Sequence, residues 1–238
     1  MKKITLLASI LCSSIIVLHA QDKAFDKGTI VISGGVGLGI YKTKTHSEQT
    51  YGSVTFKDDT TDAAASVIYP ITAEYGVTNW LGVGARFGFS NYFEEKENDT
   101  INGVAYSYQP KYTAVDLDLV LNFHLVKTKR FDMPVSLIIG YSKFKLVQNN
   151  PNTNPIGSPD NGGFRAKDNG THYGIMVTPR IYFTDHFGMY FNAGYLGYSY
   201  NSLSFSNNSD SNLNDTYNWK FSLKGNGLNL GLGLVAKF

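Results

Sequence analysis

Gly227-Leu228-Asn229-Leu230-Gly231-Leu232-Gly233-Leu234-Val235-Ala236-Lys237-Phe238, the last stretch of the sequence, indicates the fold class. Leucines at every second position fall on one face of a β-strand, whereas a helix would scatter them around its axis. The interior glycines also oppose a helix, because each costs about 1 kcal/mol there relative to alanine. We therefore predict an amphipathic strand with one bulky apolar face and one face of small or polar residues.

The same alternation recurs in seven earlier segments, which gives eight predicted strands. In each segment Leu, Ile, Val, Phe or Tyr lies on one side, and mostly Gly, Ser, Thr, Asn or ionisable residues lie on the other. The segments span residues 30–40, 67–75, 81–89, 115–125, 135–141, 173–183 and 189–195. Pro179 falls inside one of them and cannot donate to a strand ladder, so we expect a bulge or irregularity there.

The connections between these strands alternate in length. Short ones lie near residues 76–79, 127–132 and 184–187, and long polar ones lie near 43–63, 93–111, 147–169 and 201–217. Short turns on one side and long loops on the other are typical of a transmembrane up-and-down barrel. The long loops are expected to be mobile. The sequence shows no internal repeat or linker, so residues 21–238 are predicted to form one barrel domain.

The bulk of the two strand faces predicts which one meets lipid. A soluble barrel of the lipocalin kind turns its large apolar residues inward around a ligand. An eight-stranded barrel without such a ligand has an interior only just wide enough for side chains. Glycine and small polar residues suit that interior, and the bulky face then meets lipid. The predicted fold is all-β, an eight-stranded antiparallel transmembrane barrel, and we expect a monomer.

Aromatic residues concentrate near both ends of the predicted strands, where they would form two girdles at the membrane interfaces. Those near the short turns are Tyr75, Trp80, Phe123, Phe131, Phe183 and Phe187, and those toward the long loops are Tyr41, Phe89, Tyr92, Tyr112, Tyr141, Tyr173, Tyr198 and Trp219. The alternative is that aromatics simply favour strands. That preference explains their number but not their concentration at the ends.

The N-terminus has the layout of a secretory signal peptide. Lys2 and Lys3 precede an apolar run, and Ala20 offers a small residue for cleavage, which predicts a leader over residues 1–20. A transmembrane anchor would need roughly 20 apolar residues, more than this run provides. Cys12, the single cysteine, lies inside the run, so no disulfide is expected after cleavage, and Leu11 before it argues against lipidation.

Charge and composition exclude several classes of function. The chain has 21 Lys and Arg against 19 Asp and Glu, and removing Lys2 and Lys3 with the leader leaves 19 against 19. A neutral chain without a basic run has no electrostatic footprint for nucleic acid. The 42% hydrophobic and 17% charged content also fits neither a disordered chain nor a coiled coil.

With these features the chain resembles the small outer-membrane β-barrel family of Gram-negative bacteria, the OmpA/OmpX-like barrels. Its Tyr-, Asn- and Gly-rich composition is also similar to barrels of the Bacteroidetes. The resemblance implies an outer-membrane location, contact with outer-membrane lipid and lipopolysaccharide, and recognition by the barrel-assembly machinery. It further implies that the terminal strand, with Leu232, Leu234 and Phe238, is the part that this machinery reads. No peptidoglycan-binding domain follows the barrel, so a wall-anchoring role is not implied.

Charged residues on the inner face are the main candidate site. They are Glu74, Arg86, Asp116, Asp118, Arg180 and Lys237, three acids and three bases. Buried charges are tolerated when they are paired and hydrogen-bonded, which predicts a salt-bridge network that fills the barrel. The alternative, an ion path gated by exchange of partners, is implied by the resemblance to the family. Three acids balanced by three bases in so narrow a lumen argue against a strongly selective open pore.

No catalytic residue, metal site or cofactor is predicted. Some outer-membrane barrels are lipid A-modifying enzymes that use histidine, and the candidates here are His46, His172 and His186. None lies in a recognisable nucleophile motif, and His172, near the outer end of a strand, is predicted to be solvated or part of a girdle. The acidic stretch 209–215 lacks the ligand spacing of an EF-hand.

The function predicted from these features is structural or surface-directed. Long loops on one side of a filled barrel would meet extracellular partners, and the chain is not expected to be an enzyme. A narrow porin-like channel for small solutes is the main alternative, and a lipid A-modifying enzyme is the third candidate.

Overall fold

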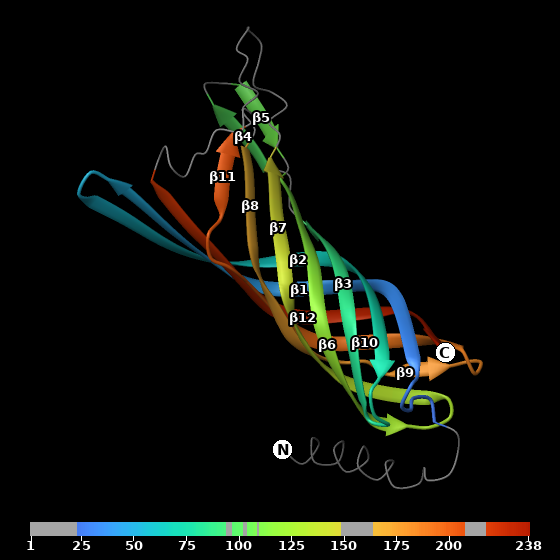
Figure 1. Cartoon of the computed structure of the whole chain (residues 1–238). Helices are drawn as coiled ribbons and strands as arrows, with labels where there is room; N and C mark the ends of the chain where they lie inside the picture. The colour runs from blue at the N-terminus through green and yellow to red at the C-terminus, as the bar shows by residue number, and fades with distance from the viewer. Residues whose placement is uncertain (1–22, 94–96, 102–103, 109, 149–163, 208–217) are drawn as a thin grey trace, which may run out of the picture.

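The computed structural model describes residues 23–93, 97–101, 104–108, 110–148, 164–207 and 218–238. The described chain is all-β and forms a closed barrel (Figure 1). The barrel strands are β1 (Ile30–Tyr51), β2 (Val54–Gly76), β3 (Leu81–Phe93), β6 (Lys111–Lys127), β7 (Phe131–Gln148), β8 (Phe164–Val177), its continuation β9 (Arg180–Tyr182), β10 (Phe187–Tyr200) and β12 (Trp219–Lys237). The remaining strands are β4 (Glu97–Ile101), β5 (Val104–Tyr108) and β11 (Ser204–Asn207).

Neighbours in the sequence are neighbours in the ring, and all pairings are antiparallel. The terminal strand β12 closes the ring by pairing with β10 on one side and with β1 on the other, where Leu230 lies opposite Leu38. The last residue, Phe238, exchanges two backbone hydrogen bonds with Ile30, of 2.8 and 2.9 Å. The predicted eight-stranded up-and-down barrel is therefore confirmed.

The two faces of the wall differ as the alternation predicts. Apolar side chains such as Ile40, Ile139 and Leu234 point outward, and Leu234 is 72% exposed. Polar, charged and small residues point into the lumen together with several aromatics. Among the described residues, no helix is long and apolar enough to cross a membrane.

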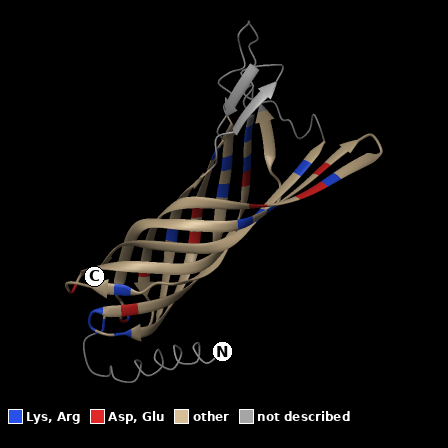
Figure 2. Cartoon of the chain, turned by 180° about the vertical axis from the view of Figure 1, so that it is seen from behind, with Lys and Arg blue, Asp and Glu red and all other residues tan. Residues whose placement is uncertain are grey.

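The first long connection, predicted as a loop over 43–63, is instead a β-ribbon. Strands β1 and β2 stay paired up to Tyr51 opposite Val54, and Gly52 turns the chain at a φ of 57°. β12 extends alongside β1 as far as Trp219 opposite Gln49. Both faces of the ribbon carry polar residues, and Figure 2 shows bands of both charges along it. Because both faces are wet, the sequence lacks the apolar alternation that signals a strand.

Other long connections also contain strands. Residues 93–111 hold the hairpin of β4 and β5, and β11 pairs with the outer part of β8. The short connections lie where the sequence predicted them. The predicted leader 1–20 and the acidic stretch 209–215 lie outside the described residues.

Proline interrupts the wall at the expected place. Thr178 and Pro179 separate β8 from β9, so the predicted irregularity at Pro179 is confirmed. The carbonyl of Pro179 still accepts the N–H of Phe191 at 3.0 Å, which keeps this side of the ladder closed. A second register shift lies between His124 and Val126 of β6.

The segment before β1 closes the short-turn end of the lumen, a feature the sequence did not predict. Phe25 is fully buried and stacks on the ring of His124, with centroids 3.4 Å apart and planes 7° from parallel. The N–H of Ala24 donates to the carbonyl of Thr128 at 2.6 Å, and that of Gly28 donates to Gly76 at 2.8 Å. These contacts place Phe25 below the charged side chains of the lumen.

Candidate functional site: the barrel lumen

The lower cluster, defined as Glu74, His124, Asp132 and Arg180, fills the lumen near the short turns. Arg180 donates from Nη2 to Glu74 Oε2 at 2.8 Å and from Nη1 to Asp132 Oδ2 at 3.2 Å. His124 bridges the same two acids on the other side, with Nε2 2.6 Å from Glu74 Oε1 and Nδ1 2.8 Å from Asp132 Oδ1. All four residues are buried, and they come from β2, β6, β7 and β9. The cluster therefore ties together strands from around the ring.

The upper cluster, defined as Arg86, Asp116, Asp118 and His172, lies farther toward the long connections. Arg86 Nη1 donates to Asp118 Oδ2 at 2.7 Å, and His172 Nδ1 lies 2.9 Å from Asp118 Oδ1. The hydroxyl of Ser142 donates to Asp116 Oδ1 at 2.5 Å. These side chains are all buried, and these hydrogen bonds replace part of the water that the two acids lose, whereas His172 Nε2 has no partner among the described residues.

Each cluster holds two acids, one arginine and one histidine. A carboxylate only accepts hydrogen bonds, so the two acids facing His124 require either the doubly protonated ring or a proton on one acid. With a doubly protonated His124 the lower cluster is neutral. The lumen as a whole holds four acids, two arginines and two histidines, in place of the predicted three acids and three bases.

A small polar chamber separates the two clusters. It has a volume of about 40 Å³, and its lining includes Arg86, Arg180, Asn122, Tyr190 and Asn192. Among the described buried atoms, Arg180 Nε and Asn192 Oδ1 have no protein partner. A chamber of this size and polarity has room for a few hydrogen-bonded water molecules but not for a larger solute.

Glycines on the inner wall make room for the clustered carboxylates. A Cβ atom added at Gly82 would lie 2.0 Å from Glu74 Oε1, and one added at Gly140 would lie 2.4 Å from Asp118 Oδ1. These carboxylates are held by arginine and histidine, so they cannot move aside without losing their partners. The glycine-rich inner faces therefore serve the charge clusters and do not leave the lumen empty.

The substitution Gly82→Ala tests this packing. We expect it to lower the free energy of unfolding by about 1–3 kcal/mol, because the added methyl displaces Glu74 from Arg180 and His124. Gly225→Ala is the matched control, since its Cβ would meet only Thr43 Cγ2, at 3.7 Å. Urea unfolding of both variants measures the effect. Equal stability of the two variants would show that the Gly82 position is not crowded.

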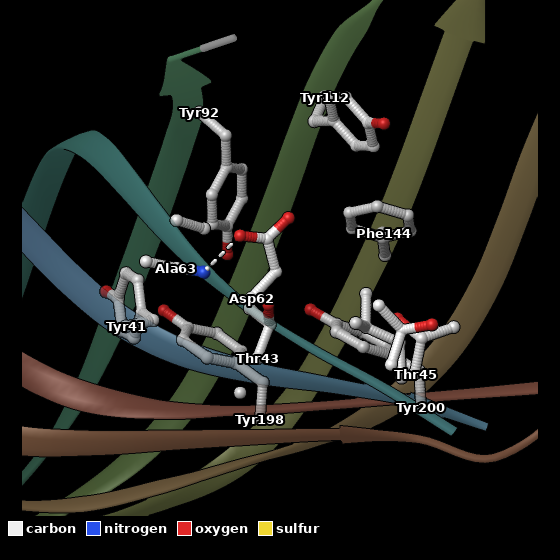
Figure 3. A pocket seen from close by; sticks show the side chains of 14 residues that line it. Tyr41, Thr43, Thr45, Asp62, Ala63, Tyr92, Tyr112, Phe144, Tyr198 and Tyr200 are labelled. Atoms are coloured by element: carbon white, nitrogen blue, oxygen red, sulfur yellow. Dashed lines mark hydrogen bonds between the residues drawn. The ribbon is translucent and has the colours of Figure 1, made fainter.

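An aromatic cup lies next to the upper cluster, toward the end with the long connections, and Figure 3 shows the residues that line it. The cup has a volume of about 200 Å³ and is lined mainly by aromatic and threonine side chains. Its lining residues are Tyr41, Thr43, Thr45, Thr60, Asp62, Ala63, Ala64, Tyr92, Tyr112, Phe144, Tyr198, Tyr200, Leu223 and Gly225. The hydroxyl of Tyr198 lies 3.4 Å from Asp116 Oδ2, and that of Tyr200 lies 2.7 Å from Ser142 Oγ. The floor of the cup is thus connected to the upper cluster.

The structure brings together five of the six predicted lumen charges. Glu74 and Arg180 belong to the lower cluster, whereas Arg86, Asp116 and Asp118 belong to the upper one. Lys237 lies apart at the short-turn end, half-buried, with Nζ 4.8 Å from the centroid of the Tyr182 ring. Its position next to the chain terminus puts it at the rim and not among the buried acids.

Part of the predicted aromatic girdle is wrong, because four of its members line the cup. Tyr75, Trp80, Phe183, Tyr141 and Tyr173 are exposed on the outside, and Phe123 stacks beside Trp80. The half-buried Trp219 starts β12 opposite Gln49, near the tip of the ribbon. The inward-facing members are Tyr41, Tyr92, Tyr112 and Tyr198. Their position near the strand ends suggested a girdle, but they share the inner parity of their strands, as Tyr41 does with Gly39.

The histidines also differ from expectation. His172 is not solvated: it is fully buried, pairs with Asp118 and stacks on Tyr198 at a centroid distance of 4.4 Å. Inner parity with Gly170 and Gly174 was the sequence signal for it. His124 and Asp132 were missing from the predicted network, and Asp132 was assigned to a turn.

The two other candidate histidines, His46 and His186, lie outside the lumen. Nδ1 of His46 is 2.7 Å from Asp59 on the exposed ribbon, and Nδ1 of His186 is 3.1 Å from the carbonyl of Lys237 at a short turn. In the part of the chain that the structure describes, no group of three or more His, Cys, Asp or Glu residues is arranged to hold a metal ion.

The terminal-strand residues named for assembly are on the outer wall. Leu232, Leu234 and Phe238 are all exposed there. Their recognition by the assembly machinery remains a prediction.

The fold and the lumen define the chain as an eight-stranded antiparallel β-barrel of the type found in outer-membrane proteins. No family model matches the sequence, and a search of curated proteins found no relative. The structure is similar to that of the outer membrane protein OprG from Pseudomonas aeruginosa, with a TM-score of 0.55 and 12% identity over 91% of this chain and 99% of that one.

Two further solved structures are more distant. The outer membrane protease OmpT from Escherichia coli matches with a TM-score of 0.45 and 9% identity over 92% of this chain and 99% of that one. The attachment invasion locus protein Ail of Yersinia pestis matches with a TM-score of 0.40 and 12% identity over 89% and 99%. At these identities the likeness concerns the fold.

Proposed function

We propose that this chain is an integral outer-membrane barrel with a sealed lumen and a role in surface interactions. The observation that carries the proposal is the filling of the lumen. From one end to the other, Phe25, the lower cluster, a chamber of about 40 Å³ and the upper cluster follow one another. Ion pairs between strands hold these side chains in place, so a solute path would need several buried pairs to break.

Extracellular partners would bind at the end of the barrel with the long connections. The ribbon of β1 and β2 extends beyond β3, whose pairing with β2 reaches only to Ala65 opposite Phe93. Its tip carries exposed Tyr51, Val54 and Phe56. Exposed apolar groups gathered at the tip of a paired ribbon are typical of contact sites.

The remaining parts of the proposal follow from the wall. The exposed apolar outer face fits outer-membrane lipid, and its rim aromatics fit the interfaces and the neighbouring lipopolysaccharide. We further propose export by a cleaved leader over residues 1–20, assembly through the terminal strand, and a monomer without catalytic activity or cofactor. The resemblance to small Gram-negative barrels supports these points, and the Bacteroidetes type stays a prediction.

Planar-bilayer recording of the refolded protein tests the sealed lumen. We expect no conductance steps, because the pair of Arg180 on β9 with Glu74 on β2 crosses the lumen, and the buried side chains of the upper cluster fill it farther up. A general porin recorded in parallel is the positive control for insertion and detection. Insertion of this chain itself is checked by the different gel mobility of unboiled and boiled samples. Reproducible steps from an inserted, folded sample would replace the sealed barrel by the narrow channel.

A further inference from the structure

We infer that the aromatic cup binds a small organic cation carrying a methylated ammonium group. The cup belongs to neither charge cluster, and the sealed lumen does not require it. Tyr41, Tyr198 and Tyr200 are buried at its base, while Thr60 and Asp62 are exposed at its rim. The cup is therefore open toward solution at the end where the ribbon extends.

The rings of the cup form a closed circuit. Centroid distances run from Tyr41 to Tyr92 at 6.1 Å, to Phe144 at 6.5 Å, to Tyr200 at 5.3 Å, to Tyr198 at 6.3 Å and back to Tyr41 at 5.5 Å. Tyr112 joins the circuit beside Phe144 at 6.0 Å. A flat, regular circuit with these side lengths would place a group at its middle about 5 Å from each centroid, within the roughly 6 Å range of cation–π attraction.

Charge favours a cation over other small ligands. Among the described residues that line the cup there is no lysine or arginine, and Asp62 supplies a carboxylate. This carboxylate lies at the exposed rim, where one oxygen accepts the N–H of Ala63 at 2.7 Å, the dashed line in Figure 3. Aromatic faces with one acid are the combination that recognises quaternary ammonium groups. A sugar would also stack on the rings, but because it is uncharged it would gain no ionic attraction from the Asp62 carboxylate.

The size of the cup limits the occupant. A volume of about 200 Å³ lies below the range of drug-sized ligand sites, so the ligand is a small solute and not a lipid chain. The phosphate of a phosphocholine headgroup would meet Asp62 without a compensating base among the described lining residues. We therefore assign the site to a free ammonium solute.

Isothermal titration calorimetry of the refolded protein tests this assignment. The detergent should be of the polyoxyethylene type, which carries neither ammonium nor sugar. Choline and tetramethylammonium are expected to bind saturably, and 3,3-dimethylbutan-1-ol, the uncharged isostere of choline, about tenfold more weakly or not at all. Glycerophosphocholine and glucose separate the headgroup and carbohydrate alternatives, and tighter binding of either would overturn the assignment.

Substitutions at the cup distinguish the contribution of an aromatic ring to choline binding from a general loss of folding. Tyr92→Phe keeps the aromatic face and should bind choline within about twofold of the parent chain, whereas Tyr92→Leu should bind about tenfold more weakly. Asp62→Asn lies at the exposed rim and should weaken binding about three- to tenfold. Tyr69→Leu, on the outer face of β2, is the control and should have no effect on choline binding.

Gel mobility and the urea midpoint verify that each variant is folded. If Tyr92→Leu does not fold, the Asp62→Asn variant and the comparison of choline with its neutral isostere still test whether the cup binds a cation. Equal binding of choline and the isostere, absence of choline binding, or equal losses in Tyr92→Leu and Tyr69→Leu would refute the cation site. None of these results would bear on the sealed lumen, which conductance tests separately.

Discussion

Replacing Arg180 by methionine is expected to lower the free energy of unfolding by about 3–5 kcal/mol. Arg180 is the one arginine that contacts both acids of the lower cluster, at 2.8 Å and 3.2 Å. Methionine has a similar length but leaves Glu74 and Asp132 buried with His124 as their remaining cation. A buried acid without its counter-charge costs far more than the net gain from the intact pair.

Urea unfolding in lipid vesicles, followed by tryptophan fluorescence, measures this effect. Arg130→Met, in the exposed turn before β7, is the matched control and should change stability by no more than about 0.5 kcal/mol. Adding Glu74→Gln to Arg180→Met should recover part of the loss, because one uncompensated charge is removed. A loss below about 1 kcal/mol for Arg180→Met would mean that water reaches the lower cluster and that the lumen is not sealed there.

Most of what the sequence predicts about the fold comes from strand parity, the alternation of successive residues between the two faces of a strand. Alternation in the terminal strand, as between Leu230 and Gly231, predicted the barrel and the outward apolar face. The same parity placed Glu74, Arg86 and Asp118 inside. It could not show which acid meets which base, because partners such as Glu74 and Arg180 are far apart in the chain, and their meeting depends on ring closure.

The wrong predictions have two causes. In some segments nearness to a strand end was given more weight than strand parity, and in others the sequence has no alternation from which parity could be read. Tyr41 and His172 were assigned by their nearness to strand ends, although their parity places them inside. The ribbon over 43–63 has two wet faces and therefore no alternation. Phe25 lies in the irregular segment before β1, and its stacking on His124 is a tertiary contact that no periodic sequence pattern predicts. The sequence did not predict the cup for the first of these reasons, since four of its five tyrosines were expected in the girdle.

Replacing Leu119 by arginine is the second change with a large expected effect. Leu119 lies at the middle of β6, is 51% exposed on the outer wall and pairs with Ile139 and Ala85 on the flanking strands. If this face meets the hydrocarbon core, arginine there should lower the free energy of unfolding by about 2–4 kcal/mol. The same exposed position in a soluble barrel would tolerate arginine with little loss.

Phe56→Arg separates the membrane effect from the loss of an apolar side chain. Phe56 is 60% exposed, but it lies near the tip of the ribbon, beyond the ring, where arginine stays in water. Its substitution should change stability by no more than about 0.5 kcal/mol. Unfolding in vesicles gives the comparison, and the same pair in a short-chain detergent should differ less because arginine reaches water more easily there. Equal effects of Leu119→Arg and Phe56→Arg in vesicles would contradict a lipid-facing wall. A large effect confined to Leu119 would place the membrane around the ring and leave the ribbon outside it, because a hydrocarbon layer explains a difference between two positions that are both more than half exposed on the isolated chain.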